Sequence, residues 1–154
     1  MSSPIIRLSE IENFKDCSLA YGHFDTIHPG HIRYLKYAKS LSEILVIAII
    51  GDKGNHHYPK FQFNQKERSE ALAMLDIADY IIKLEEDGLS KVVKKIKPKA
   101  LVFGKEKESQ KNIDFEIEKA INIQEDLGGL VEFKAGEVNY SSTDLLSKPE
   151  KELE

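Results

Sequence analysis

Residues 21–31 read Tyr21-Gly22-His23-Phe24-Asp25-Thr26-Ile27-His28-Pro29-Gly30-His31, and they separate a short apolar segment from an amphipathic one. The segment before them, residues 18–21, is apolar enough to form a buried strand. After them, apolar residues repeat at helical spacing, namely Ile32, Leu35, Ala38 and Leu41. The run therefore predicts a strand, a loop and a helix N-terminus, where backbone N–H groups lack intrahelical partners and favour an anion.

Two histidines lie at the expected start of this helix. Pro29 suits a first helical turn because its missing N–H would have had no partner, and Gly30 lets a large anion approach the backbone. His28 and His31 are three residues apart and can face one ligand. The helix dipole contributes only about 0.3–1 kcal/mol at an exposed end, so the imidazoles and nearby lysines must supply most of the specificity.

Composition limits the classes of protein that the chain can belong to. With 154 residues, 41% of them hydrophobic, it can bury one core. We expect one domain over residues 1–147 and, over residues 148–154, a charged tail or the start of a linker. The net charge of -4 arises from 22 basic and 26 acidic residues, and no basic stripe indicates a nucleic-acid surface.

Cysteine usage and hydropathy predict the compartment. The single cysteine, Cys17, cannot form an intrachain disulfide, and the N-terminus lacks the apolar core of a signal peptide. The longest apolar run, residues 44–50, is far shorter than the about 20 residues of a membrane span. We expect a soluble, cytoplasmic protein that binds neither nucleic acid nor membrane.

The order of predicted elements indicates the fold. Residues 44–50 are apolar at every position, as in a central strand covered on both faces of a parallel sheet. Further strands are predicted over residues 18–21, 78–84, 100–104 and 130–133. Helices are predicted from Pro29, from the cap Asn64 through Leu75, over residues 89–96 and 113–127, and from Ser141. We expect a single Rossmann-like α/β domain with a five-stranded parallel sheet, helices on both faces and its ligand at the switch point.

Three motifs in order resemble the nucleotidyltransferase superfamily named for its HxGH signature, in its cytidylyltransferase-like branch. The first comprises residues 22–25 and His28-Pro29-Gly30-His31; the second, residues 53–60 with Lys66-Glu67-Arg68; and the third, Tyr140-Ser141-Ser142-Thr143. Within that branch the chain is most similar to heptose-1-phosphate adenylyltransferases, which are often fused to a sugar kinase. Glycerol-3-phosphate cytidylyltransferases and archaeal FAD synthases are near relatives.

The resemblance implies transfer of a nucleoside monophosphate from ATP or CTP to a phosphorylated sugar or polyol, with release of pyrophosphate. A sugar 1-phosphate of the heptose type is the first choice of acceptor, and glycerol 3-phosphate and FMN are alternatives. Mg²⁺ is expected to arrive with the triphosphate, without a dedicated set of protein ligands. The resemblance also implies carbohydrate metabolism, and it is compatible with a homodimer and with a fused or partner sugar kinase.

Site residues carry over from the three motifs. The resemblance implies a catalytic set of His28, His31 and Lys60, in which the histidines stabilise charge in the transition state. Lys53 and Arg68 are expected to contact the acceptor or other phosphates. The expected nucleotide-binding residues are Gly22, His23, Phe24, Asp25, Gly30, Gly104, Ser141, Ser142 and Thr143.

Several of these residues have a second interpretation. His28 and His31 could form a zinc pair with His23 or Asp25, although no HExxH pattern or second cysteine supports it. Asp25 could cap the turn that follows it. Residues 141–143 could be only a helix cap.

Two further alternatives concern Arg68 and catalysis itself. Arg68 could simply pair with Glu67 or Glu70 on its own helix. His23 and Lys105 stand where relatives carry a small residue or cysteine and an acid, respectively, which motivates the rival hypothesis of a nucleotide-binding module without turnover.

Overall fold

The computed structural model describes residues 2–11, 14, 16–52, 62–85, 88–104 and 115–135. Within these residues six strands form one parallel sheet in the order β1-β4-β3-β2-β5-β6. The strands are β1 (Ile5–Ile6), β2 (Cys17–Gly22), β3 (Ile44–Ile49), β4 (Tyr80–Lys83), β5 (Ala100–Gly104) and β6 (Leu130–Ala135). The helices are α1 (Pro29–Ser40), α2 (Gln65–Met74), α3 (Leu89–Ile96) and α5 (Phe115–Asp126), with a 3-10 turn, η1, at Leu8–Glu10.

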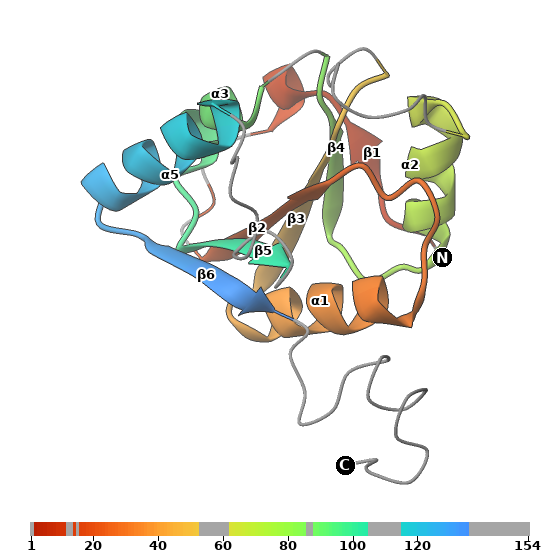
Figure 1. The fold of residues 1–154 in the computed structure, drawn as a ribbon, viewed down its shortest axis with the longest axis horizontal. Coiled ribbons are helices and arrows are strands. Elements are labelled where there is room, and N and C mark those ends of the chain that lie inside the picture. The colour runs from red at the N-terminus through yellow and green to blue at the C-terminus, as the bar shows by residue number, and fades with distance from the viewer. Residues whose placement is uncertain are drawn as a thin grey trace, which may run out of the picture.

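Helices cover both faces of the sheet (Figure 1). On one face, Leu35 of α1 and Leu72 of α2 belong to the same buried cluster as Ile47 of β3. On the other face, the apolar sides of α3 and α5 pack with alternate residues of the same strand, such as Val46 and Ala48. The uniformly apolar β3 is therefore buried from both sides, which confirms the expected parallel α/β sheet.

The prediction of five strands was one too few. β1 has two residues, Ile5 and Ile6, and pairs with β4 at the edge of the sheet. So short a strand shows no period-two alternation, and tertiary pairing rather than local sequence decides its existence. Other boundaries differ by at most two residues, and the helix predicted from Ser141 lies outside the described residues.

The chain reverses its direction of travel across the sheet between β2 and β5. Strands β2, β3 and β4 follow one another outward, and the chain then returns to place β5 and β6 on the other side of β2. The pairing of β2 with β5 extends as far as Ala20 opposite Val102. This is the topological switch point, and residues 23–28 follow β2 there.

A tyrosine from α1 joins the two strands at this switch point. The buried hydroxyl of Tyr34 accepts a hydrogen bond from the Tyr21 N–H at 3.0 Å and donates one to the Val102 carbonyl at 2.6 Å. The hydroxyl of Tyr34 thus bonds to both strands just where their pairing ends, and it holds α1 against the sheet.

Candidate active site

Two histidines cap α1 reciprocally. His28 is the N-cap residue, and its Nδ1 accepts a hydrogen bond from the Gly30 N–H at 3.0 Å. His31 Nδ1 in turn accepts from the His28 N–H at 3.1 Å. The ring centroids lie 4.0 Å apart with 32° between their planes. The arrangement has the logic of a capping box, with imidazole nitrogens in place of the usual side-chain oxygens.

This cap determines which nitrogen of each ring can donate. A neutral imidazole carries one proton, so a ring whose Nδ1 accepts a hydrogen bond has that proton on Nε2. His28 and His31 are therefore both set in the tautomer whose Nε2–H can donate to an anionic oxygen. Because the backbone orients the rings in advance, such donors need little reorganisation when charge develops on a ligand.

The backbone amides of the first helical turn are already engaged. The Gly30 N–H bonds to the His28 ring, and the N–H groups of His31 and Ile32 both donate to the His28 carbonyl. Pro29 has no N–H. The sequence led us to expect unpaired amides here, but the side chain of His28 satisfies one of them. In this conformation the helix amides of the first turn are therefore not the unpaired anion donors that the sequence predicts.

Gly30 has a local reason to be glycine. A Cβ at this position would lie 2.8 Å from Cε1 and 3.0 Å from Nδ1 of His28. Real Cβ atoms essentially never come that close, so a larger residue would displace the ring from its cap. Glycine at position 30 therefore leaves the room that the His28 ring needs to cap the helix.

Phe24 supports the loop from below. Its side chain is buried, and its ring lies 5.5 Å from that of His31 and 6.4 Å from that of Tyr34. Phe24 has a positive φ of 50°, which is uncommon outside glycine. A Cβ on Gly22 would lie 3.1 Å from the Phe24 ring. Gly22 and Phe24 thus form the packed base on which the histidine pair rests.

Asp25 ties the histidine loop to the segment before α2. Its two carboxylate oxygens accept hydrogen bonds from the N–H groups of Gln62 at 2.9 Å and Phe63 at 3.0 Å. Burial raises the pKa of Asp25, but these two bonds and the charges of Arg68 and His23 outweigh it, so the pKa lies below its ordinary value. Asp25 thus caps a segment that is distant in the sequence.

Arg68 connects three elements from inside the protein. Its side chain is 1% exposed and donates to the backbone carbonyls of Phe63 at 2.9 Å, His23 at 2.8 Å and Ile50 at 2.9 Å. Its ion-pair partner is Asp52, at 2.8 Å, and not Glu67 or Glu70 on its own helix. In this conformation Arg68 acts as a positioning residue. Its expected contact with an acceptor phosphate stays a prediction.

Sequence reasoning missed Asp52. Its Oδ1 accepts from Arg68 and also from the Gln65 N–H at 2.7 Å, at the start of α2. The available signal was an acid three residues beyond the end of β3, at the same sheet edge as the expected ligand. The pairing itself depends on where the fold brings α2.

Comparison with known proteins identifies the family. A family model described as cytidylyltransferase-like matches residues 19–147. The chain belongs to the cytidylyltransferase-like family. It is a nucleotidyltransferase with a nucleotide-binding, Rossmann-like fold, as the three motifs predict.

FAD synthases and bifunctional HldE proteins are among the curated relatives of this nucleotidyltransferase. The chain is 30% identical to an FAD synthase of Archaeoglobus fulgidus over 118 residues, covering 70% of this chain and 85% of that protein. It is 36% identical to an FAD synthase of Ferroglobus placidus, covering 56% of this chain and 57% of that protein. It is also 33% identical to the bifunctional protein HldE of Helicobacter pylori, covering 82% of this chain but only 26% of that protein.

Solved structures give the same fold for this nucleotidyltransferase. A lipopolysaccharide core biosynthesis protein from Thermoplasma volcanium aligns with a TM-score of 0.61 and 28% identity, covering 77% of this chain and 96% of that one. Pantothenate synthetase from Thermus thermophilus aligns with a TM-score of 0.54 at 15% identity, covering 85% of this chain and 61% of that one, and shows the fold alone.

The remaining predicted residues of the nucleotidyltransferase fall in two places. Gly104 ends β5, beside β2 at the switch point, and His23 Nδ1 accepts from the Asp25 N–H at 3.3 Å within the histidine loop. The other predicted residues lie outside the described ranges, namely Lys53, Lys60, Ser141, Ser142 and Thr143. The structure thus brings the first motif and Arg68 together, and the roles of all the predicted site residues stay predictions.

Among the described residues, no group of three or more His, Cys, Asp or Glu side chains is placed to hold a metal ion. Within those ranges, no helix combines the length and the apolar character that crossing a bilayer requires.

Proposed function

We propose that the chain transfers a nucleoside monophosphate from ATP or CTP to a phosphorylated sugar or polyol and releases pyrophosphate. The first choice of acceptor is a sugar 1-phosphate of the heptose type, supported by the match to HldE over 82% of this chain. The observation that carries the proposal is the reciprocal cap of His28 and His31 at the switch point. It holds two imidazole donors where an α/β sheet of this kind binds its ligand.

The reaction requires the protein to position the reactants and to neutralise charge, and it forms no covalent enzyme intermediate. An oxygen of the acceptor phosphate attacks the α-phosphorus, and the bond from that phosphorus to the oxygen that bridges the α- and β-phosphates breaks. Nε2–H groups of His28 and His31 donate to the phosphoryl oxygens as charge gathers on them. Lys53 and Lys60 are proposed to neutralise phosphate charge, and Ser142 and Thr143 to bind the β- and γ-phosphates.

Mg²⁺ is proposed to accompany the nucleotide and to neutralise charge on its phosphates. Near the histidine pair, the carboxylate of Asp25 already accepts two backbone amides, and that of Asp52 accepts Arg68 and Gln65. Neither carboxylate is part of a metal-ligand group in the described residues. The donor set therefore fits an ion held by phosphate oxygens and water, with no dedicated protein cage.

FMN is the second candidate acceptor. The FAD synthase of Archaeoglobus fulgidus matches over 85% of its own length, whereas HldE matches over 26% of its length. A relative matched over most of its length supports the FMN acceptor as a serious alternative. The chemistry at phosphorus is the same, and only the recognition of the acceptor differs.

The test is a grid of pyrophosphate-release assays with Mg²⁺. ATP and CTP are each combined with heptose 1-phosphate, other sugar 1-phosphates, glycerol 3-phosphate and FMN. Release in the heptose 1-phosphate assays supports the first choice, and release with FMN alone replaces it by the second candidate. Nucleotide binding by calorimetry with no release in any combination would favour the non-catalytic module, and absence of both would contradict the proposal.

A further inference from the structure

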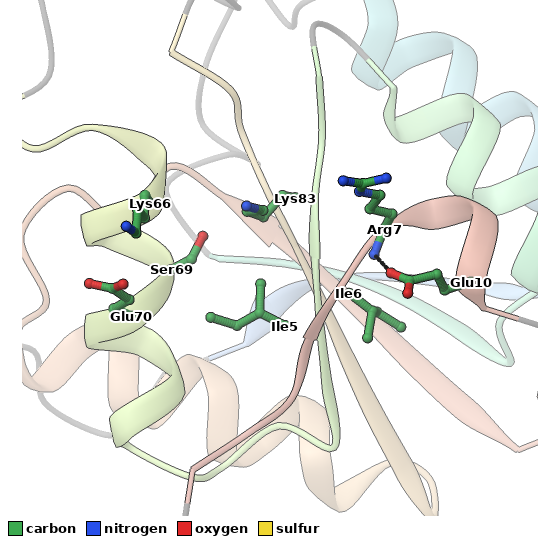
Figure 2. A pocket seen from close by; sticks show the side chains of 8 residues that line it. All are labelled: Ile5, Ile6, Arg7, Glu10, Lys66, Ser69, Glu70 and Lys83. Carbon is green, nitrogen blue, oxygen red and sulfur yellow. Dashed lines mark hydrogen bonds between the residues drawn. The ribbon is translucent and has the colours of Figure 1, made fainter.

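A pocket of about 270 Å³ opens between α2 and the outer edge of the sheet (Figure 2). It lies over β1 and β4, whereas the histidine loop follows β2, and β3 separates the two places in the sheet order. Ile5 of β1 lies opposite Ile81 of β4, and Ile81 packs in the same cluster as α2. The pocket thus lies on the face of the sheet that α2 covers.

Three basic side chains from three elements line this pocket. Arg7 follows β1 directly, Lys83 is the last residue of β4, and Lys66 lies in the first turn of α2. The pairing of Ile6 with Ile82 brings Arg7 and Lys83 to adjacent places at the carboxyl edge. In Figure 2 the side chain of Lys83 extends from β4 towards α2, where Lys66 and Ser69 lie.

The cations exceed the acids in the pocket and are not paired with them. The acids are Glu10 and Glu70, and Glu10 accepts a hydrogen bond from the Arg7 N–H at 2.7 Å. In the described part of the chain, none of Arg7, Lys66 and Lys83 forms an ion pair. The N-terminus of α2 adds a partial positive charge close to Lys66. The pocket therefore favours an anion.

A buried hydroxyl in the same pocket has no partner. Ser69 of α2 is fully buried, and its Oγ forms no hydrogen bond within the described structure, although the residue lines the pocket. Figure 2 shows this hydroxyl directed into the space beside Lys83. A buried hydroxyl without a partner is uncommon because it costs free energy. An acceptor oxygen on a ligand would satisfy it.

We propose that this pocket binds a phosphate group, carried by inorganic phosphate or by a phosphomonoester. Ser69 Oγ–H would donate to one phosphate oxygen, and Lys66, Lys83 and Arg7 would neutralise the charge. The site is separate from the His28 and His31 pair and does not depend on the function proposed above. It gives the protein a second anion site on the same edge of the sheet.

The test is a titration followed by amide chemical shifts in ¹⁵N-labelled protein. The probes are inorganic phosphate, glucose 1-phosphate and, as an uncharged control, glucose. We expect saturable shifts at the amides of Ser69 and Lys83 with either phosphate and none with glucose. Shifts with both phosphates identify the phosphate group itself as the ligand, and shifts with glucose 1-phosphate alone identify a phosphomonoester.

Variants decide whether this pocket is the site. Ser69→Ala and Lys83→Gln should each weaken binding at least 5-fold, whereas Lys36→Gln on the exposed side of α1 should leave it unchanged. His28→Asn should also leave it unchanged, because that residue belongs to the other site. The proposal is overturned by an absence of saturable shifts, by equal binding to Ser69→Ala and Lys83→Gln, or by loss of binding in His28→Asn.

Discussion

Replacing Arg68 with methionine tests whether this buried guanidinium organises the active site. Methionine keeps the length and the apolar stem but removes every donor. Three backbone carbonyls, those of His23, Ile50 and Phe63, would then lose their donor. At about 1 kcal/mol for each hydrogen bond, the variant should lose about 3 kcal/mol, a large part of a typical stability of about 5–15 kcal/mol.

The ion pair of Arg68 contributes less to this sum than the carbonyls. Asp52 is 51% exposed, so solvent screens the pair and its contribution stays below about 1 kcal/mol. Asp52→Asn is therefore the matched control, because it keeps an acceptor oxygen and should cost less than about 1 kcal/mol. Urea unfolding followed by circular dichroism measures the unfolding free energy of both variants. The urea midpoint should be lowered clearly in Arg68→Met and little in Asp52→Asn, with the slope of the free energy against urea unchanged in both.

A second readout separates positioning by Arg68 from direct contact with substrate. If Arg68 positions the loop, Arg68→Met lowers both the unfolding midpoint and kcat, because the carbonyl of His23 is released. If Arg68 instead contacts the acceptor phosphate, the variant raises KM and keeps the stability of the wild type. An unchanged midpoint with a raised KM would refute the positioning role.

Three further predictions concern single side chains. Tyr34→Phe removes the hydrogen bonds of this hydroxyl with the Tyr21 N–H and the Val102 carbonyl and should lower the free energy of unfolding by about 1–3 kcal/mol. Tyr37→Phe, whose hydroxyl makes a long 3.4 Å bond, should cost little in the same urea assay. Burial and, to a lesser extent, the charge of Asp16 raise the pKa of the Cys17 thiol to about 12. Iodoacetamide at pH 8 should therefore label Cys17 only in urea, and rapid labelling of the native protein would contradict this. Folding lowers the pKa of Asp25, so its contribution to the free energy of unfolding is present above about pH 4 and is lost as the pH falls through the folded pKa. The difference in unfolding free energy between the wild type and Asp25→Asn should therefore narrow at pH 3, and a difference that widens in acid would refute the assignment.

Local pattern was sufficient to predict most of the fold. The apolar run of β3 and the helical spacing after His31 each report burial within one element, so the sequence showed both directly. The cap Asn64 follows the same local logic and is confirmed, and Glu67 returns a hydrogen bond to its backbone. β1 escaped prediction because a pair of isoleucines becomes a strand only by pairing with β4.

The site was less predictable, because its geometry depends on contacts across the chain. The spacing of His28 and His31 indicated that both rings could face one ligand. It did not indicate that the His28 ring would accept a hydrogen bond from the Gly30 N–H and the His31 ring one from the His28 N–H. Local spacing offers Arg68 only acids on its own helix as ion-pair partners, whereas the fold brings Asp52 to it from beyond the end of β3. Such pairings depend on how α2 packs on the sheet, which no local pattern encodes.

The reciprocal histidine cap is the central claim, and His28→Asn tests it most directly. Asparagine is a favourable N-cap whose oxygen can replace Nδ1 of His28, so the helix and the unfolding midpoint should be preserved. The variant lacks the Nε2–H donor, so kcat for pyrophosphate release should fall at least about 10²-fold, as when one preorganised donor is removed. Release at the wild-type rate by a folded His28→Asn protein would contradict the account.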